Sequence, residues 1–166
     1  MENAETNQGN SILNALKKLE RAGSEGSKTV QKLKDATYKV ADFIAEQIDA
    51  VIDLDRSGGL YITGELLSWM ELFDDYELHI RRFKNVEWYT KAILQKDNCC
   101  FNATSEEIEQ LDDNEELRGT CRKDALFFSS DIANGLLDKI AEMLEKKNKK
   151  SITAFETIEK EIPKEN

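Results

Sequence analysis

The sequence has little of the residue chemistry that makes tight turns. Its 166 residues include one proline and eight glycines. A β-sandwich or barrel needs many short strands joined by the turns that these residues favour. Their scarcity favours helices instead, and we predict an all-α fold, a single-domain bundle of five to seven helices.

Residues that commonly build catalytic and metal sites are also scarce. There is one histidine, His79, and there are three cysteines, of which Cys99 and Cys100 are adjacent and Cys121 is distant. This set lacks the spacing of a zinc site and cannot pair completely into disulfides. No serine lies in the sequence context of an activated nucleophile. We therefore expect a protein in a reducing compartment that is not an enzyme and holds no organic cofactor.

Long hydrophobic runs are missing as well. No apolar stretch approaches the roughly 18 residues that span a bilayer, and nothing near Met1 resembles a signal peptide. We expect a cytoplasmic protein that does not contact a membrane. The net charge of −10, from 33 acidic and 23 basic residues, argues against direct binding to nucleic acid.

Apolar residues recur every three or four positions over residues 30–51, which is typical of an amphipathic helix. Val30, Leu33, Ile44 and Ile48 share one face of this helix, and charged residues lie opposite. Such regular spacing predicts a neighbouring helix at a shallow angle, so we place this helix at the centre of the bundle. Other helices are expected over residues 11–22, 63–94 with a kink near residue 84, 104–118, 122–147 and the segment up to 162.

Breaks in this periodicity define the expected domain. Residues 1–10 show none and are predicted to be a flexible tail, 11–162 form the helical domain, and 163–166 are a second tail. The glycines and serines of 23–27 are the strongest break, so helix 11–22 is expected to be a separable arm. Further along, Thr104 and Glu107 have the spacing of a capping box.

The segment after the central helix resembles the first part of an EF-hand calcium loop. Aspartates and a serine fall at ligand positions 1, 3 and 5, and Gly58 stands at position 6, where the family needs a sharp bend. At position 12, where the family has a bidentate glutamate, this chain has Gly64. The alternative is a helix end whose Asp and Ser side chains cap backbone amides. The resemblance implies a weak calcium site, and a calcium-responsive module, with the ligands Asp53, Asp55, Ser57, Gly59, Tyr61 and Glu65.

Residues 97–118 form an acidic segment with eight acids and one base. One interpretation is a solvated helix face, which is the common role of such charge runs. Another is a surface that mimics a nucleic-acid backbone and inhibits a basic nucleic-acid-binding protein.

Several apolar side chains point away from the inward rows of their expected helices. A contiguous exposed patch of such residues usually marks an interaction site. We therefore expect a small acidic interaction protein, such as a regulator, inhibitor or adaptor, whose partner is a protein with a basic rim or a second copy of the chain. The candidate partner-binding residues are Trp88, Phe127, Phe43, Leu67 and Leu78, with the carboxylates Glu106, Glu107, Asp112 and Asp113.

Overall fold

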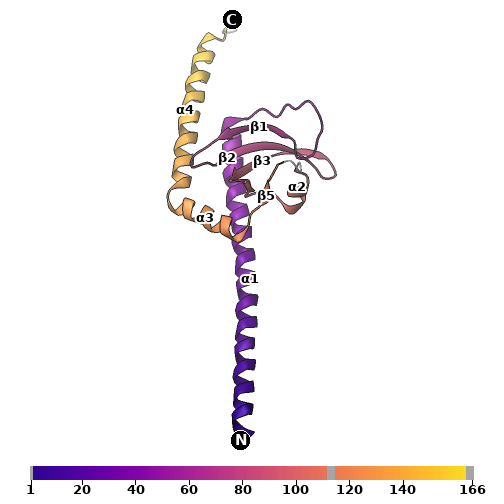
Figure 1. Ribbon diagram of the computed structural model, residues 1–166. Coiled ribbons are helices and arrows are strands. Elements are labelled where there is room, and N and C mark those ends of the chain that lie inside the picture. The colour runs from indigo at the N-terminus through magenta and orange to yellow at the C-terminus, as the bar shows by residue number, and fades with distance from the viewer. Residues whose placement is uncertain (1, 112–114, 164–166) are drawn as a thin grey trace.

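The computed structural model describes residues 2–111 and 115–163, with side chains from residue 9 onward. These residues form helices and a five-stranded mixed sheet, so the predicted all-α helical bundle is wrong. Figure 1 shows the sheet beside the upper half of one long helix, with shorter helices around it. The elements are α1 (Glu2–Ile52), β1 (Leu66–Glu71), β2 (Glu77–Lys84), β3 (Trp88–Lys96), β4 (Cys99–Cys100), α2 (Ser105–Glu109), β5 (Arg118–Gly119), α3 (Arg122–Ala133) and α4 (Leu136–Glu161).

The strands follow one another across the sheet in chain order. β1 to β4 pair antiparallel, and β5 pairs parallel with β4. Two of the antiparallel connections turn at neighbouring residues with positive φ, Asp74 and Asp75 before β2, and Asp97 and Asn98 between β3 and β4. Turns with both central residues at positive φ match the twist of paired strands, which is why they close hairpins.

The expected helix over residues 63–94 is therefore replaced by the hairpins of β1, β2 and β3. In β2 the buried residues alternate between the two faces of the sheet. Leu78 and Ile80 join the larger core, while Phe83 joins a smaller cluster with Ile93 of β3. A strand buried on both faces is a nearly continuous run of buried positions, and such a run also satisfies the spacing of a helix.

The larger core lies between the sheet and three helices. From α1 it takes Ala41, Ile44, Ala45 and Ile48, all buried, which confirms the inward position predicted for Ile44 and Ile48. α3 and α4 cover the same core. They are separate helices because Gly135, between them, has a left-handed conformation with φ 97°, which interrupts the right-handed helix. Their buried members are Ala125, Phe128, Leu136 and Ile140.

α1 is one continuous helix from Glu2 to Ile52, so the break expected at residues 23–27 does not occur. Two glycines cost a helix roughly 1 kcal/mol each, which is too little to end a helix that continues with regular apolar spacing on both sides of them. The N-terminal half of α1 projects away from the sheet (Figure 1), and the far end of α4 projects the opposite way. No helix among the described residues is long and apolar enough to cross a membrane.

Candidate helix-docking surface

The N-terminal half of α1 carries an apolar row that is exposed to solvent over most of its length and partly buried only at its base, at Val30 and Leu33. We define the α1 arm as residues 9–33, which precede Thr37, the first buried residue of the helix. Ile12, Leu16 and Leu19 of this arm are 63%, 57% and 69% exposed. Positions alternately three and four apart lie on one face of a helix and form the seam of a coiled coil. The whole row is Gly9, Ile12, Leu16, Leu19, Gly23, Gly26, Val30 and Leu33.

The same row continues into the half of α1 that is packed on the sheet. With unchanged spacing it reaches Thr37, Val40 and Ile44, and Thr37 and Ile44 are buried. One face of α1 therefore packs on the domain at its C-terminal half and meets solvent at its N-terminal half. A surface helix normally buries its apolar face, so the exposed face of the arm is typical of a helix that packs against another molecule.

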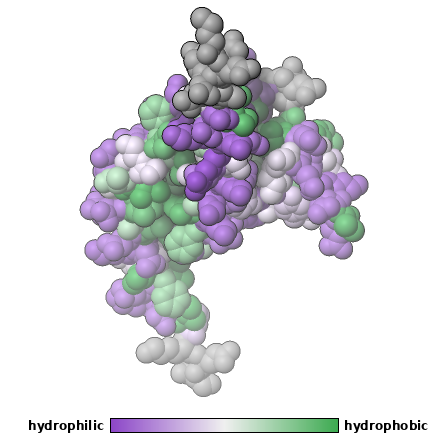
Figure 2. All heavy atoms as spheres, turned by 90° about the horizontal axis from the view of Figure 1, so that it is seen from below, coloured by the Kyte–Doolittle hydropathy of each residue, from purple (hydrophilic) through white to green (hydrophobic). Residues whose placement is uncertain are grey.

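A hollow of about 360 Å³ lies where the arm meets α3. Val30 and Leu33 of α1 and Leu126 of α3 give it an apolar lining. Phe127, the next residue of α3, is also exposed. In the view along α1 from below, Figure 2 shows hydrophobic residues gathered on the side where α3 and α4 lie. The exposed apolar surface thus extends from the arm onto the globular part of the molecule.

The glycines of the arm have no packing role within one chain. A Cβ added at Gly9, Gly23 or Gly26 would meet no atom within 4 Å. Each of the two internal glycines makes the helix less stable than alanine would, by roughly 1 kcal/mol. Glycine also leaves a helix surface flat, which allows another backbone or a large side chain to approach closely.

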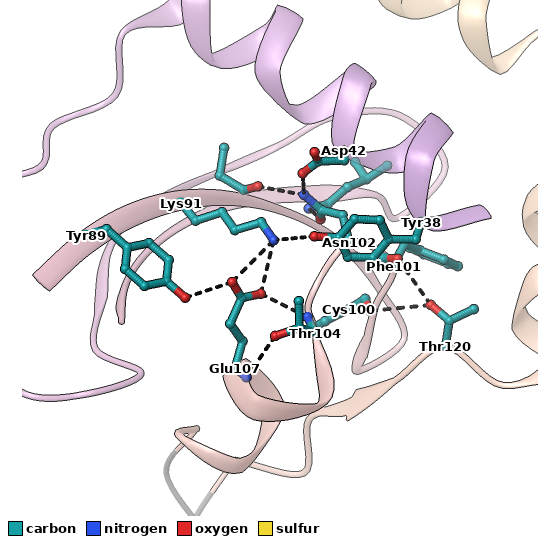
Figure 3. Close-up of polar contacts among 12 residues, drawn as sticks. Tyr38, Asp42, Tyr89, Lys91, Cys100, Phe101, Asn102, Thr104, Glu107 and Thr120 are labelled. Atoms are coloured by element: carbon teal, nitrogen blue, oxygen red, sulfur yellow. Dashed lines mark hydrogen bonds and ion pairs between the residues drawn. The ribbon is translucent and has the colours of Figure 1, made fainter. Parts of the chain in front are cut away.

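A polar cluster fixes the root of the arm to the sheet (Figure 3). The Lys91 ammonium of β3 donates to the Tyr38 hydroxyl of α1 at 2.8 Å and to the Glu107 carboxylate of α2 at 3.0 Å. The Tyr89 hydroxyl donates to the same carboxylate at 2.9 Å. Burial acts to lower the pKa of Lys91, but its hydrogen bonds to Tyr38 and Glu107 prevail and raise it. Burial and the Glu107 carboxylate raise the pKa of Tyr89 to about 12.

Asn102 provides a second attachment of α1 to the sheet. Its buried side-chain amide donates to the Asp42 carboxylate of α1 and to the Ala92 carbonyl, both at 2.9 Å. Its side-chain oxygen accepts from the Leu94 amide at 2.7 Å. Together with the Lys91 cluster, this amide sets the direction in which α1 leaves the domain.

Glu107 has a structural position rather than the surface position expected of a partner-binding carboxylate. It is buried, and it forms the predicted capping box with Thr104, which the structure confirms. Glu106 beside it is exposed, and Asp112 and Asp113 lie outside the described residues.

The five candidate apolar residues do not share one environment. Leu78 is fully buried in the core, and Leu67 packs partly buried against it. Trp88 lies edge-on to Tyr61. Phe43 and Phe127 are exposed, as the interaction hypothesis requires, and the arm residues Ile12, Leu16 and Leu19 are exposed in addition.

The loop that resembles a calcium site runs into strand β1, where an EF-hand has its second helix. Asp55 accepts hydrogen bonds from the Ser57 amide and hydroxyl, and these bonds lower the pKa of Asp55. Glu65 pairs with Arg82 at 3.1 Å, and the Arg82 guanidinium also lies over the Tyr61 ring. Asp53, at φ 52°, ends the helix as a left-handed residue. Among the described residues no group of three or more His, Cys, Asp or Glu is placed to hold a metal, and calcium binding stays a prediction.

The single histidine and two of the cysteines are interior residues. His79 is buried on β2, with its ring nitrogens beside Glu77 and Arg81. Burial raises the pKa of the Cys99 thiol to about 12 and that of the Cys100 thiol to about 11, so both stay protonated near neutral pH.

No protein-family model, curated protein or solved structure matches this chain.

Proposed function

We propose that the protein is an interaction module that binds another helix through the α1 arm. The observation that carries this proposal is the row of Ile12, Leu16 and Leu19, which the continuous helix α1 holds in solvent away from the domain. Burying such aliphatic side chains is the main favourable contribution to association. The binding partner supplies an apolar helical face, and the arm contributes its own face already ordered.

The charge of the arm differs from that of the rest of the chain. Residues 11–34 carry six bases and two acids, whereas the whole chain has a net charge of −10. Most of these bases lie on the faces away from the apolar row, so they give the arm a positive field that favours an acidic partner. Such complementarity speeds encounter and sets orientation more than it deepens affinity. The partner with a basic rim, expected from the sequence, would instead suit the acidic globular part.

The test compares two double variants of the full chain on an affinity matrix. Leu16→Gln with Leu19→Gln removes the apolar centre of the row, and Lys17→Gln with Lys18→Gln is the matched change on the other faces. Both should keep the thermal stability of the wild type because these four side chains contact nothing in the domain.

The expected result is that proteins retained by the wild type, a differently tagged second copy included, are retained by the lysine variant and lost from the leucine variant. Equal retention by all three would contradict the proposal, because binding would then not depend on the apolar row.

A further inference from the structure

We propose that the helix bound by the α1 arm is the α1 arm of a second copy, running antiparallel. This inference rests on the proposed function and specifies its partner. The row of glycines and large aliphatic residues in the arm is complementary to itself in one register. In that register the two-fold axis passes at residue 21, so that any two row positions whose numbers sum to 42 face each other.

Each large residue of the row then meets a glycine or a smaller residue. Leu19 faces the partner's Gly23, Leu16 faces the partner's Gly26, and Leu33 faces the partner's Gly9. Ile12 faces the partner's Val30. In an antiparallel coiled coil, each layer pairs a seam position that is followed by a three-residue step with one that is followed by a four-residue step. All four pairs of the arm meet this requirement.

This register gives the glycines the role that they lack in a single chain. The space next to Gly23 and Gly26 is open in the isolated molecule. Leucine side chains of the partner fill that space, as large residues fill gaps opposite small ones in a packed core. A parallel arrangement would instead place Gly23 and Gly26 opposite themselves and leave both layers empty.

The positions beside the row support a close approach of the two helices. Ala15, Ala22 and Thr29 precede row positions at seven-residue spacing and form a strip of small side chains. In the antiparallel register Ala22 lies next to the partner's Ala22 at the axis, and Ala15 lies next to the partner's Thr29. Small residues along one edge of a helix pair allow the backbones to come together.

The area available comes close to that of a specific interface. The row of each arm offers five large apolar side chains, of which Val30 and Leu33 are already partly buried, and burying an aliphatic side chain removes on the order of 100 Å² from water. Two arms together therefore bury at most roughly 1,000 Å², the lower bound for a specific interface. The tip of each arm also comes to the hollow between α1 and α3 of the other copy, where Leu126 adds to the contact.

The first experiment tests whether large residues face glycines. Sedimentation equilibrium should show the wild type as a dimer of the 19.0 kDa chain. Gly23→Leu should weaken dimerisation at least tenfold, because two leucines then compete for one layer. The swapped variant Leu19→Gly with Gly23→Leu has the composition of the wild type and restores one leucine to each layer, so it should recover the dimer.

A dimer as tight or tighter with Gly23→Leu alone would overturn the register, since a leucine there would then find room. A monomeric wild type across the accessible concentration range would overturn the second copy as the partner.

The second experiment tests the direction of pairing. In a Cys121→Ser background, which removes the exposed native thiol, Ala22→Cys should form a disulfide-linked dimer under mild oxidation. Ala15→Cys is the matched control. In the antiparallel register its thiol is 12 residues, about 18 Å along the helix, from its counterpart. Both positions lie on the same edge of the helix, and in a parallel dimer the two copies of that edge lie on opposite sides of the seam, so neither position would cross-link. A dimer that cross-links at neither position, or equally at both, would overturn the antiparallel register.

These outcomes separate the dimer from the broader function. If the wild type is monomeric and Leu16→Gln with Leu19→Gln still abolishes retention of another protein, the arm binds a different helix and only the second copy is excluded. If dimerisation and all retention are unaffected by the same leucine changes, both proposals fail.

Discussion

The buried ion pair between Lys91 and Glu107 should be the most sensitive polar contact at the root of α1. The exposed fractions of these side chains are 18% and 6%. The change Glu107→Gln keeps the capping box with Thr104, because the one side-chain oxygen of glutamine can still accept from the Thr104 amide. It removes the negative charge and puts an amide NH2 group in place of the oxygen that accepts from Tyr89. Lys91 is left inside the cluster with the Tyr38 hydroxyl and one neutral oxygen as its partners.

Removing one partner of a buried ion pair costs about 3–5 kcal/mol, because the other charge stays without compensation. Lys91 keeps some contact with solvent, so we expect the lower end, a loss of about 3 kcal/mol in the free energy of unfolding. For a chain of this size each kcal/mol moves the melting temperature by roughly 2–4 °C, which predicts a fall of about 6–12 °C.

Urea denaturation followed by circular dichroism measures this loss, and Glu106→Gln on the exposed side of the same helix is the control. The double variant Lys91→Met with Glu107→Gln should be more stable than Glu107→Gln alone, because methionine removes the uncompensated charge. Equal stability of the two single glutamine variants would refute the reasoning, since the pair would then be no more than a surface contact.

Two further predictions concern the backbone and the protonation of the same region. Gly64→Ala should lower the free energy of unfolding by about 2 kcal/mol or more, since φ is 75° and the new Cβ would lie 2.2 Å from the Gln110 carbonyl oxygen. Gly59→Ala is the control, because its Cβ meets nothing within 4 Å and should change the free energy of unfolding little. Equal denaturation curves for the two variants would contradict this prediction. Tyr89 should ionise with a pKa of about 12, so the stability that it contributes is complete below pH 10 and lost as the pH rises toward 12. The difference in phenolate absorbance between the wild type and Tyr89→Phe, followed against pH, measures this pKa. A midpoint near 10 would show that Glu107 does not hold the hydroxyl.

The buried faces of the long helices follow from sequence periodicity, but the bounds of the helices do not. The helix expected over 104–118 is the short α2, and the helix expected over 122–147 is divided between α3 and α4. Ile44 and Ile48 of α1 and Phe128 and Ile140 of α3 and α4 are buried as their spacing predicts. Each helix needs only one apolar stripe, and a stripe is a local property of the sequence.

The sheet could not be found in the same way. β2 and the end of β3 are buried on both faces, so they lack the alternation that identifies a half-exposed strand. The turns that join the strands use Asp74–Asp75 and Asp97–Asn98 at positive φ, without the glycine that usually marks a two-residue hairpin. Asp and Asn tolerate this conformation, and a pair of them between apolar runs was the signal that could have indicated a hairpin.

The sequence indicated the apolar face of residues 11–22 correctly, but the break expected at residues 23–27 hid its continuation along α1. The spacing of Ile12, Leu16 and Leu19 defines a helical face, but the glycines after them suggested a break. The row continues with the same alternation of three and four residues through Gly23 and Gly26 to Val30. That unbroken spacing was the evidence in the sequence for one long helix. It is stronger evidence than the low helix propensity of the glycines, because a coiled-coil seam requires a continuous apolar row.

The weakest part of the arm as an isolated helix is also the part that a second copy would support best. Residues 23–29 contain two glycines, two serines and a threonine, all poor helix formers, and they contact nothing in the globular domain except at the base of the arm. In the antiparallel register these residues face Leu16 and Leu19 of the partner. Residues 11–22 of each arm, which favour a helix, thus pack against residues 23–29 of the other. Formation of the dimer should therefore stabilise the helix, and a stable helix should favour the dimer.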